Sequence, residues 1–299
     1  MATMVAVLVL LGAGWGLSVP LGKIAVMAGH RDFGIIFWQS VIAAAVVLPF
    51  VLLRGGLPLH RKALLIYAFV AAAGTLIPNA ASFSAQRFLP AGVAALCLSL
   101  IPMTALPIAL LMRTDYATPG RLLGLVAGAI GVALIVLPGS ALPDRSMVPW
   151  VLLALAATVF YGLEGNGIIR FGPTGLGPMQ MVAGASLVTA LIALPLAAAR
   201  GVFINPVRPW VEADWAVAVG GVLNVGSYVG YIWLVGRAGA VFASQVSYLV
   251  TGFGVFWAMV LLGERFSPWF WAAAAVIFVG LALVQPRAAT PDPSGAVAE

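Results

Sequence analysis

Charged side chains are scarce in this sequence. Asp, Glu, Lys and Arg make up 8% of the 299 residues, hydrophobic residues make up 63%, and the mean hydropathy is +1.10. A water-soluble globular domain contains about 25% charged residues, so this composition excludes that class. The chain is therefore predicted to lie in a lipid bilayer.

Residues that ligate metals or form disulfides are equally scarce. The single cysteine, Cys97, excludes an internal disulfide and is interpreted as a small packing residue. The two histidines, His30 and His60, fall in predicted loops, and the sequence has no HExxH motif and no pair of aspartates within a span. These absences argue against an intramembrane enzyme. We expect no catalytic residue, no metal site and no cofactor.

The basic residues are scattered along the chain. They give a net charge of +6 but stand in short loops rather than in one patch, so no nucleic-acid partner is expected. An even number of spans would place both termini on one side of the membrane. The basic residues divide almost evenly between the two sides, and only those of the first half favour cytoplasmic termini.

Long apolar runs fill the chain. Each is close to the ~20 residues that cross a hydrocarbon core of ~30 Å, and only helices can form them, because open strands would leave backbone groups unpaired in lipid. The first run lacks the features of a signal peptide, so we expect it to be a span. The ten runs cover residues 4–28, 33–53, 62–86, 90–112, 119–138, 147–169, 177–199, 214–236, 239–262 and 268–285.

An internal repeat of about 147 residues relates the two halves of the chain. Trp15-Gly16 corresponds to Tyr161-Gly162, and IGVALIVLP (130–138) corresponds to VGLALVQP (279–286). Each unit holds five spans, and because five is odd the second unit enters the membrane in the opposite sense. We predict an all-α membrane protein with ten transmembrane helices, arranged as two inverted five-helix repeats around a central cavity. The repeats cover residues 1–142 and 143–286, and a disordered tail covers 287–299.

Glu164 is an acidic residue in the sixth span. A carboxylate at this depth costs about 2.5–3.5 kcal/mol, and this cost should keep it off the lipid face and beside a cavity. Tyr161 stands three residues earlier on the same helical face. The repeat relates Tyr161 to Trp15 and Glu164 to Ser18, and the glycines at 162, 165 and 167 would let a neighbouring helix or a ligand approach closely.

Three roles for Glu164 remain open. When ionised, it could pair with a substrate ammonium group; when protonated, it could donate a hydrogen bond or couple transport to protons. It could instead be a structural partner of Lys23 or Arg170, although Arg170 is too far along the helix for a direct neighbour.

Other polar and aromatic residues fall at similar depths in the remaining spans. Pockets for small molecules combine apolar walls with a few placed polar groups, yet serines in membrane helices usually bond a backbone carbonyl, and the asparagines could form a structural network. Candidate helix interruptions that would line the cavity are Pro20, Pro78, Pro102, Pro107, Gly252 and Gly254. The candidate substrate-binding residues are Trp15, Ser18, Asn79, Ser99, Tyr161, Glu164, Asn224, Tyr228, Ser244, Gln245 and Tyr248.

Two segments carry a family resemblance. The first span contains WGLSVPLGK (15–23), and the second unit ends in LLGERFSPWFWAAAAVIFVGLALV (261–284). These segments resemble the drug/metabolite transporter superfamily and, within it, the ten-helix proteins with paired EamA-type domains. The resemblance extends to about residue 286, but RTDYATP (113–119) stands where the first unit often has a Gly-Glu turn.

The resemblance implies a location and a function. It implies cytoplasmic termini, a bacterial inner membrane, and a cavity lined by spans 1–4 and 6–9, with spans 5 and 10 at the outer edge, where they would aid association into a homodimer. Among these proteins the chain is most similar to exporters of aromatic amino acids and amphipathic metabolites. The function expected is secondary transport by alternating access, with a small-molecule substrate and the lipid bilayer as partners.

Two other functions stay open. One is a multidrug or other metabolite exporter of the same superfamily. The more remote one is a channel, which needs rings of like groups or a continuous polar stripe, whereas the polar residues here cluster near one depth.

Overall fold

The computed structural model describes residues 2–137, 142–171 and 175–284, and within these ranges the regular structure is entirely helical. The predicted tail, 287–299, lies outside the described residues. The helices are α1 (Ala2–Met27), α2 (Asp32–Leu53), α3 (Arg61–Val70), the π-helix η1 (Ala71–Leu76), α4 (Ile77–Gln86), α5 (Ala91–Leu98), α6 (Ile101–Met112), α7 (Pro119–Val136), the 3-10 helix η2 (Arg145–Met147), α8 (Val148–Phe171), α9 (Pro178–Ala199), α10 (Glu212–Ala238), α11 (Ala240–Ser244), α12 (Val246–Leu262) and α13 (Pro268–Val284).

These helices follow the predicted apolar runs to within a few residues. In the described part of the chain, nine helical segments are long and apolar enough to cross a membrane, and α13 is a shorter apolar helix. The prediction of an all-α membrane protein is confirmed. The count of ten spans and the opposite orientation of the repeats stay predictions.

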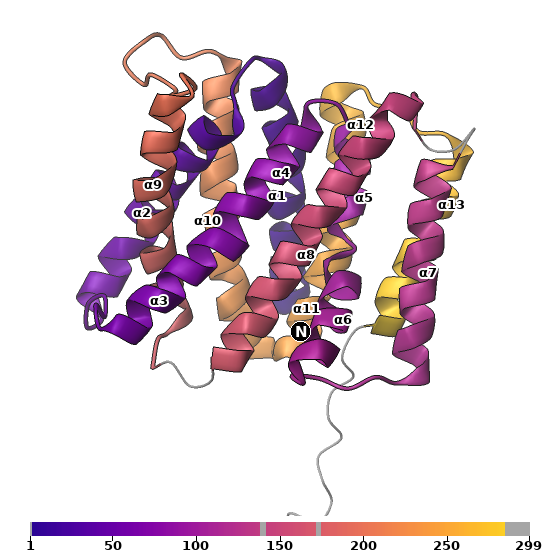
Figure 1. Cartoon of the computed structure of the whole chain (residues 1–299), viewed down its shortest axis with the longest axis horizontal. Helices are drawn as coiled ribbons and strands as arrows, with labels where there is room; N and C mark the ends of the chain where they lie inside the picture. Colours follow the sequence, from indigo (N-terminus) through magenta and orange to yellow (C-terminus); the bar gives the residue numbers. More distant parts are fainter. Residues whose placement is uncertain (1, 138–141, 172–174, 285–299) are drawn as a thin grey trace, which may run out of the picture.

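The helices of the two halves pack on one another in matching pairs. α1 packs on α10 and α12, whereas α8 packs on α4 and α6. The first helix of each half therefore contacts the third and fourth spans of the other half. α2 likewise packs on α9, and α7 packs on α13 at the edge of the molecule (Figure 1).

Three spans are interrupted. The third span changes into the π-helix η1 just before Pro78. The fourth is broken between α5 and α6 at Ser99, just before Pro102, and the ninth is broken at Gln245 between α11 and α12. Interruptions were predicted for the third and fourth spans, and for the ninth at a different position.

Four of the candidate interruptions are wrong. α1 runs unbroken through Pro20, α6 runs unbroken through Pro107, and α12 runs unbroken through Gly252 and Gly254. α1 and α12 pack closely on each other, since a Cβ at Gly16 would lie 2.8 Å from the backbone nitrogen of Gly254. Neighbouring helices of this kind can hold a proline-containing helix together in lipid. Gly254 thus provides close approach rather than a break.

Candidate functional site

One hydrogen bond joins the first helix of the first half to the third span of the second half. The indole Nε1–H of Trp15 on α1 donates to Oδ1 of Asn224 on α10 at 3.0 Å. The Trp15 ring lies 6.4 Å from the ring of Tyr228 and 6.1 Å from that of Tyr231, centroid to centroid, in edge and tilted orientations. Such aromatic contacts add to the stability of packed rings.

The equivalent bond joins the other two helices. The hydroxyl of Tyr161 on α8 donates to Oδ1 of Asn79 on α4 at 2.6 Å. Tyr161 corresponds to Trp15 in the repeat, and Asn79 occupies the place of Asn224. Each half thus contributes an aromatic donor to the asparagine of the other half, and we refer to these as the two aromatic–asparagine pairs.

Asn224 faces the interior of the protein. Its side chain is exposed, yet Trp215 and Trp233, which are exposed on the outer surface, stand nine residues before and after it. Nine residues are two and a half turns of ~3.6 residues, so the tryptophans lie on the opposite side of α10. An exposed side chain on the inner side of a helix indicates an internal space that solvent can reach.

The carboxylate of Glu164 lies against the π-helix η1. A Cβ added to Gly74 would be only 2.6 Å from Oε1 and 2.7 Å from Oε2 of Glu164, so a side chain at this position would displace the carboxylate. Gly165, the next residue of α8, is exposed and has nothing within 4 Å of the position its Cβ would take. The position of Glu164 beside a cavity stays a prediction.

Pro78 gives a physical reason for the π-helix at this place. In an α-helix the amide of residue 78 would donate to the carbonyl of Gly74, but proline has no N–H. The chain instead makes a wider turn, in which the amide of Ile77 donates to the carbonyl of Ala72. π-Helical turns inside α-helices occur frequently at functional sites.

A basic partner for Glu164 is absent from the ion pairs of the described residues. Lys23, one of the two predicted partners, instead donates to backbone carbonyls near the end of α4. The predicted structural salt bridge to Lys23 is therefore not formed.

The remaining predicted residues lie around or away from this group. Ser18 and Ser99 each donate to a carbonyl of their own helix, those of Trp15 and Leu96. Tyr248 packs at 6.0 Å against Phe278 of α13 rather than with the aromatic residues near Trp15. Ser244 and Gln245 stand at the break between α11 and α12, and each has interactions of its own.

Comparison with known proteins identifies the family. The model of the EamA-like transporter family matches residues 2–137 and again 148–285. The chain belongs to the EamA-like transporter family. It is a multi-pass membrane transporter of the drug/metabolite transporter superfamily, whose members are transporters and not enzymes.

Solved structures show the same fold as this EamA-like chain. In all, 23 chains match; one, described only as the crystal structure of a protein, is 21% identical with a TM-score of 0.61. The match covers 95% of this chain and 96% of the other. At this identity the similarity concerns the fold alone. None of the curated proteins matches significantly.

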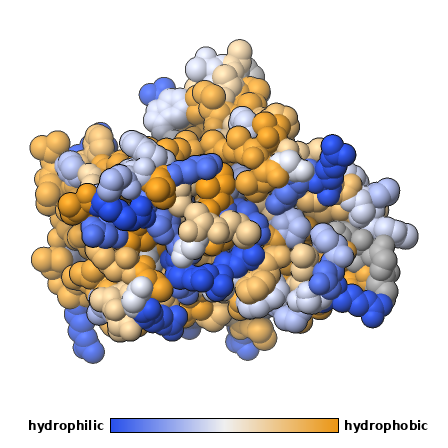
Figure 2. Space-filling model, turned by 90° about the horizontal axis from the view of Figure 1, so that it is seen from above, coloured by the Kyte–Doolittle hydropathy of each residue, from blue (hydrophilic) through white to orange (hydrophobic). Residues whose placement is uncertain are grey.

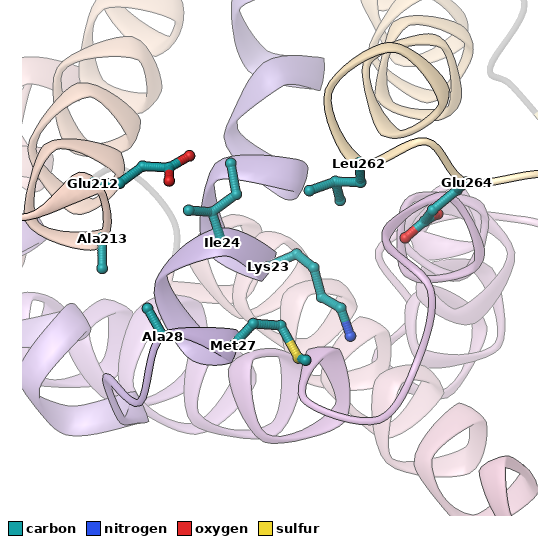
Figure 3. A pocket seen from close by; sticks show the side chains of 8 residues that line it. All are labelled: Lys23, Ile24, Met27, Ala28, Glu212, Ala213, Leu262 and Glu264. Atoms are coloured by element: carbon teal, nitrogen blue, oxygen red, sulfur yellow. The ribbon is translucent and has the colours of Figure 1, made fainter.

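A cavity of about 420 Å³ lies between the ends of α1, α10 and α12, and we call it the mouth cavity. Figure 3 shows its lining side chains, which include Lys23 and Glu264 together with Glu212. Seen from this end, polar residues gather near the centre of the molecule and hydrophobic residues cover much of its periphery (Figure 2). Lys23 is eight residues beyond Trp15 on α1, a rise of about 12 Å, so the mouth cavity lies about this far along α1 from the Trp15–Asn224 bond.

Sequence reasoning missed two parts of the site. Gly74 was not singled out, although a glycine four residues before a proline in a span is a readable sign of a freed carbonyl. Asn166, which is buried, donates through Nδ2 to the carbonyls of Ala105 (3.1 Å) and Gly162 (2.9 Å) and so joins α8 to α6. Its position between two glycines was visible in the sequence.

Among the described residues no group of three metal-ligating side chains comes together.

Proposed function

We propose that this protein is a secondary transporter that exports small amphipathic metabolites, with a preference for aromatic amino acids. The observation that carries the proposal is the pair of reciprocal aromatic–asparagine bonds with Glu164 beside one of them. Both bonds cross between the halves, so a ligand held between them contacts both halves at once. Sites of this kind, near the midplane where two repeats meet, are typical of secondary transporters.

The side chains suit the head group of an amino acid. The carboxylate of Glu164 is the partner for an ammonium group, and charge-assisted hydrogen bonds of this kind are short and strong. The oxygens of Asn79 and Asn224 accept from the aromatic donors. The amide N–H groups of the same side chains, which are donors only, are then the groups that can bind a substrate carboxylate.

The aromatic walls suit the side chain of the same substrate. Trp15, Tyr228 and Tyr231 form a cluster next to Asn224. Aromatic rings that pack edge to face against such a cluster gain about 0.5–1.5 kcal/mol beyond burial of their area, which favours phenylalanine and tryptophan over alanine.

Glu164 also offers a means of coupling. A carboxylate that binds an ammonium group must give up its proton, and the same carboxylate can take up a proton when the substrate leaves. Export of one substrate molecule would then accompany import of one proton. Alternating access would come from the two halves, residues 1–142 and 143–286, moving as inverted units around the fixed site.

The membrane arrangement completes the proposal. We place the termini in the cytoplasm and the protein in a bacterial inner membrane. The α7 and α13 pair at the edge presents exposed apolar side chains such as Leu123 and Val279 to lipid or to a second copy of the chain. Cross-linking of single cysteines on α7 and α13 in native membranes would detect a homodimer built on this edge.

The test is uptake by liposomes that contain the purified protein. Labelled Phe, Trp, Leu and Ala are each offered with and without a pH gradient, and 2-phenylethylamine and 3-phenylpropionate are added as competitors that lack one charge of the head group. Saturable uptake that favours Phe and Trp, with stronger competition by the amine than by the acid, supports the proposal. The substitution Tyr248→Phe serves as a matched control, because this tyrosine lies against Phe278 and away from the site.

The other outcomes separate the alternatives. Absence of uptake for all four amino acids, with saturable uptake of apolar organic cations, would replace the amino acid assignment with a multidrug exporter. Flux that does not saturate and shows no counterflow would indicate a channel and contradict the proposal.

A further inference from the structure

Lys23 holds one side of the connection between α4 and α5. Its Nζ donates to the carbonyls of Gln86 at 2.7 Å and Leu89 at 2.9 Å, with a longer contact to that of Arg87 at 3.4 Å. These carbonyls lie at the C-terminal end of α4, where the helix carries a partial negative charge that favours a cation. The three N–H groups of the ammonium are thus directed at backbone oxygens.

Glu264 holds the other side of the same connection. Its Oε1 accepts from the amide of Ala91 at 2.6 Å, and its Oε2 accepts from the amide of Gly92 at 3.0 Å. These amides begin α5, and an anion is favoured at the N-terminal end of a helix. Gly92 has no room for a Cβ, because the ring of Phe266 lies against it. Lys23 and Glu264 together form a clamp on residues 86–92.

The clamp joins the two halves of the molecule. Lys23 belongs to α1 in the first half, whereas Glu264 follows α12 in the second half, and both also border the mouth cavity (Figure 3). The WGLSVPLGK segment and the Gly263-Glu264 turn, which are far apart in sequence, therefore act on one short connection.

The opposite end of the molecule has no such clamp in the described residues. Arg113 ends α6 in the left-handed conformation (φ 56°), just as Gly263 ends α12 (φ 65°), so the two turns correspond. The residue after Arg113 is Thr114, which donates to Oδ1 of Asn166 at 2.9 Å. The residue equivalent to Lys23 is Ile169, which is exposed. The turn after α12 thus supplies a charged side chain to the connection, whereas the turn after α6 makes a neutral hydrogen bond, and the ion pair at that end, Asp115 with Arg121, lies within the first half.

We propose that Lys23 and Glu264 are positioning residues for transport, which act by fixing the end of α4 and the start of α5 to α1 and to the turn after α12. This inference rests on the proposed function. α4 carries Asn79, and the π-helix continuous with it carries Gly74. The Tyr161–Asn79 bond and the fit of Glu164 on Gly74 both require a fixed register between these helices and α8. The clamp holds the end of α4, about two turns beyond Asn79, and so limits how far this helix can shift relative to its neighbours.

The primary test variant is Glu264→Gln. Glutamine keeps the size of the side chain and one acceptor oxygen, but it loses the charge and one acceptor for the two amides. We expect hydrogen exchange of the peptide containing Ala91 and Gly92 to accelerate at least about tenfold in lipid nanodiscs. In liposomes the KM for phenylalanine should rise about three- to tenfold with little change in the maximal rate, as expected when substrate binding weakens and catalysis does not.

Two further variants complete the test. Lys23→Arg keeps a cation and should retain the wild-type KM, whereas Lys23→Met should raise it. Arg87→Gln is the matched control, because this side chain lies over the ring of Phe88 in the same connection and takes no part in the clamp. It should leave both exchange and KM unchanged.

The outcomes are decisive in each direction. Faster exchange in Glu264→Gln with an unchanged KM would overturn the positioning role and leave a contact that serves stability alone. Unchanged exchange would overturn the clamp itself. If the wild-type protein transports none of the amino acids, the proposed function fails and the positioning role fails with it, while the exchange data still report whether the clamp exists.

Discussion

The third spans of the two halves face equivalent partners but differ in structure. In the first half the span is interrupted by η1, and Gly74 receives the carboxylate of Glu164. In the second half α10 continues without interruption from Glu212 to Ala238 and packs on α1, the helix of Trp15 and Ser18. Val219 and Leu223 stand at the places of Gly74 and Pro78.

The comparison indicates that the third span is irregular where it packs against the charged residue Glu164. A carboxylate within the membrane needs space and polar surroundings. In the first half, Gly74 provides the space because it has no side chain. Pro78 provides the polar surroundings, because it has no N–H and leaves a backbone carbonyl without its donor. Ser18, at the place equivalent to Glu164, bonds the carbonyl of Trp15 at 2.6 Å and therefore needs no opening in α10. The two halves share the same helix packing, but only one of the two equivalent positions, that of Glu164, holds a titratable residue.

The substitution Glu164→Gln removes the charge and should have the largest effect. Loss of one charge-assisted bond to a substrate ammonium, about 1.5–3 kcal/mol, corresponds to about 10- to 150-fold slower uptake of phenylalanine at low concentration. Protein yield and monodispersity should stay unchanged because the two side chains have similar size. Uptake within twofold of the wild-type rate would contradict the role assigned to Glu164.

The substitution Gly74→Ala breaks the fit between η1 and Glu164. The added Cβ must displace the carboxylate, so we expect uptake to fall about tenfold, or 1.4 kcal/mol. Gly165→Ala is the matched control, since nothing lies within 4 Å of its Cβ, and its uptake should stay within twofold of wild type. Equal effects of the two alanines would show that helix propensity rather than the carboxylate site is responsible.

The substitutions Tyr161→Phe and Trp15→Phe each remove one hydrogen bond and keep an aromatic ring. A neutral bond contributes about 0.5–1.5 kcal/mol, so the KM for phenylalanine should rise about two- to tenfold in each case. Tyr161→Phe should have the larger effect, because the freed Asn79 adjoins Glu164. If only the protein yield falls, the two aromatic–asparagine pairs serve packing and not binding.

The substitution Asp115→Asn addresses the other end of the molecule and should have the smallest effect. The Arg121 guanidinium, at 2.6 Å, holds the pKa of the Asp115 carboxyl below its usual value near 3.9. A depressed pKa stabilises the fold above about pH 4, and this stabilisation is lost as the pH falls through the lower pKa of the folded state. The pair is partly exposed, so thermal unfolding at pH 7 should shift by only about 1–2 °C. A shift that persists unchanged below pH 3 would contradict the account.

Much of the fold could be predicted from the sequence. The apolar runs gave the helices to within a few residues, because in lipid every backbone group must be paired within its own helix. The break in the ninth span was misplaced, because Gly252 and Gly254 face open space and a neighbouring helix instead of ending α12. The local sequence shows which residues could interrupt a helix, but packing determines at which of them the helix breaks.

The site could be predicted in part. Glu164, Tyr161, Trp15 and the two asparagines followed from their depth and from the repeat, but the reciprocal bonding between halves depends on how α1 meets α10 and α8 meets α4. The position of Tyr248 against α13 could not be read from the spacing on its own helix, since two faces of α12 carry polar residues. The clamp joins residues 241 positions apart, a separation at which the sequence pattern carries no contact information.

The most direct test of the central claim is proton release on substrate binding. Phenylalanine is added to purified protein in a weakly buffered solution, and the pH change is followed from pH 5.5 to 8.5. If Glu164 binds the ammonium group as a carboxylate, the wild-type protein releases up to one proton per substrate bound over part of this range, and the Glu164→Gln protein releases none. Binding without proton release at any pH, or the same release from Glu164→Gln, would contradict the claim that Glu164 both recognises the substrate and couples its transport.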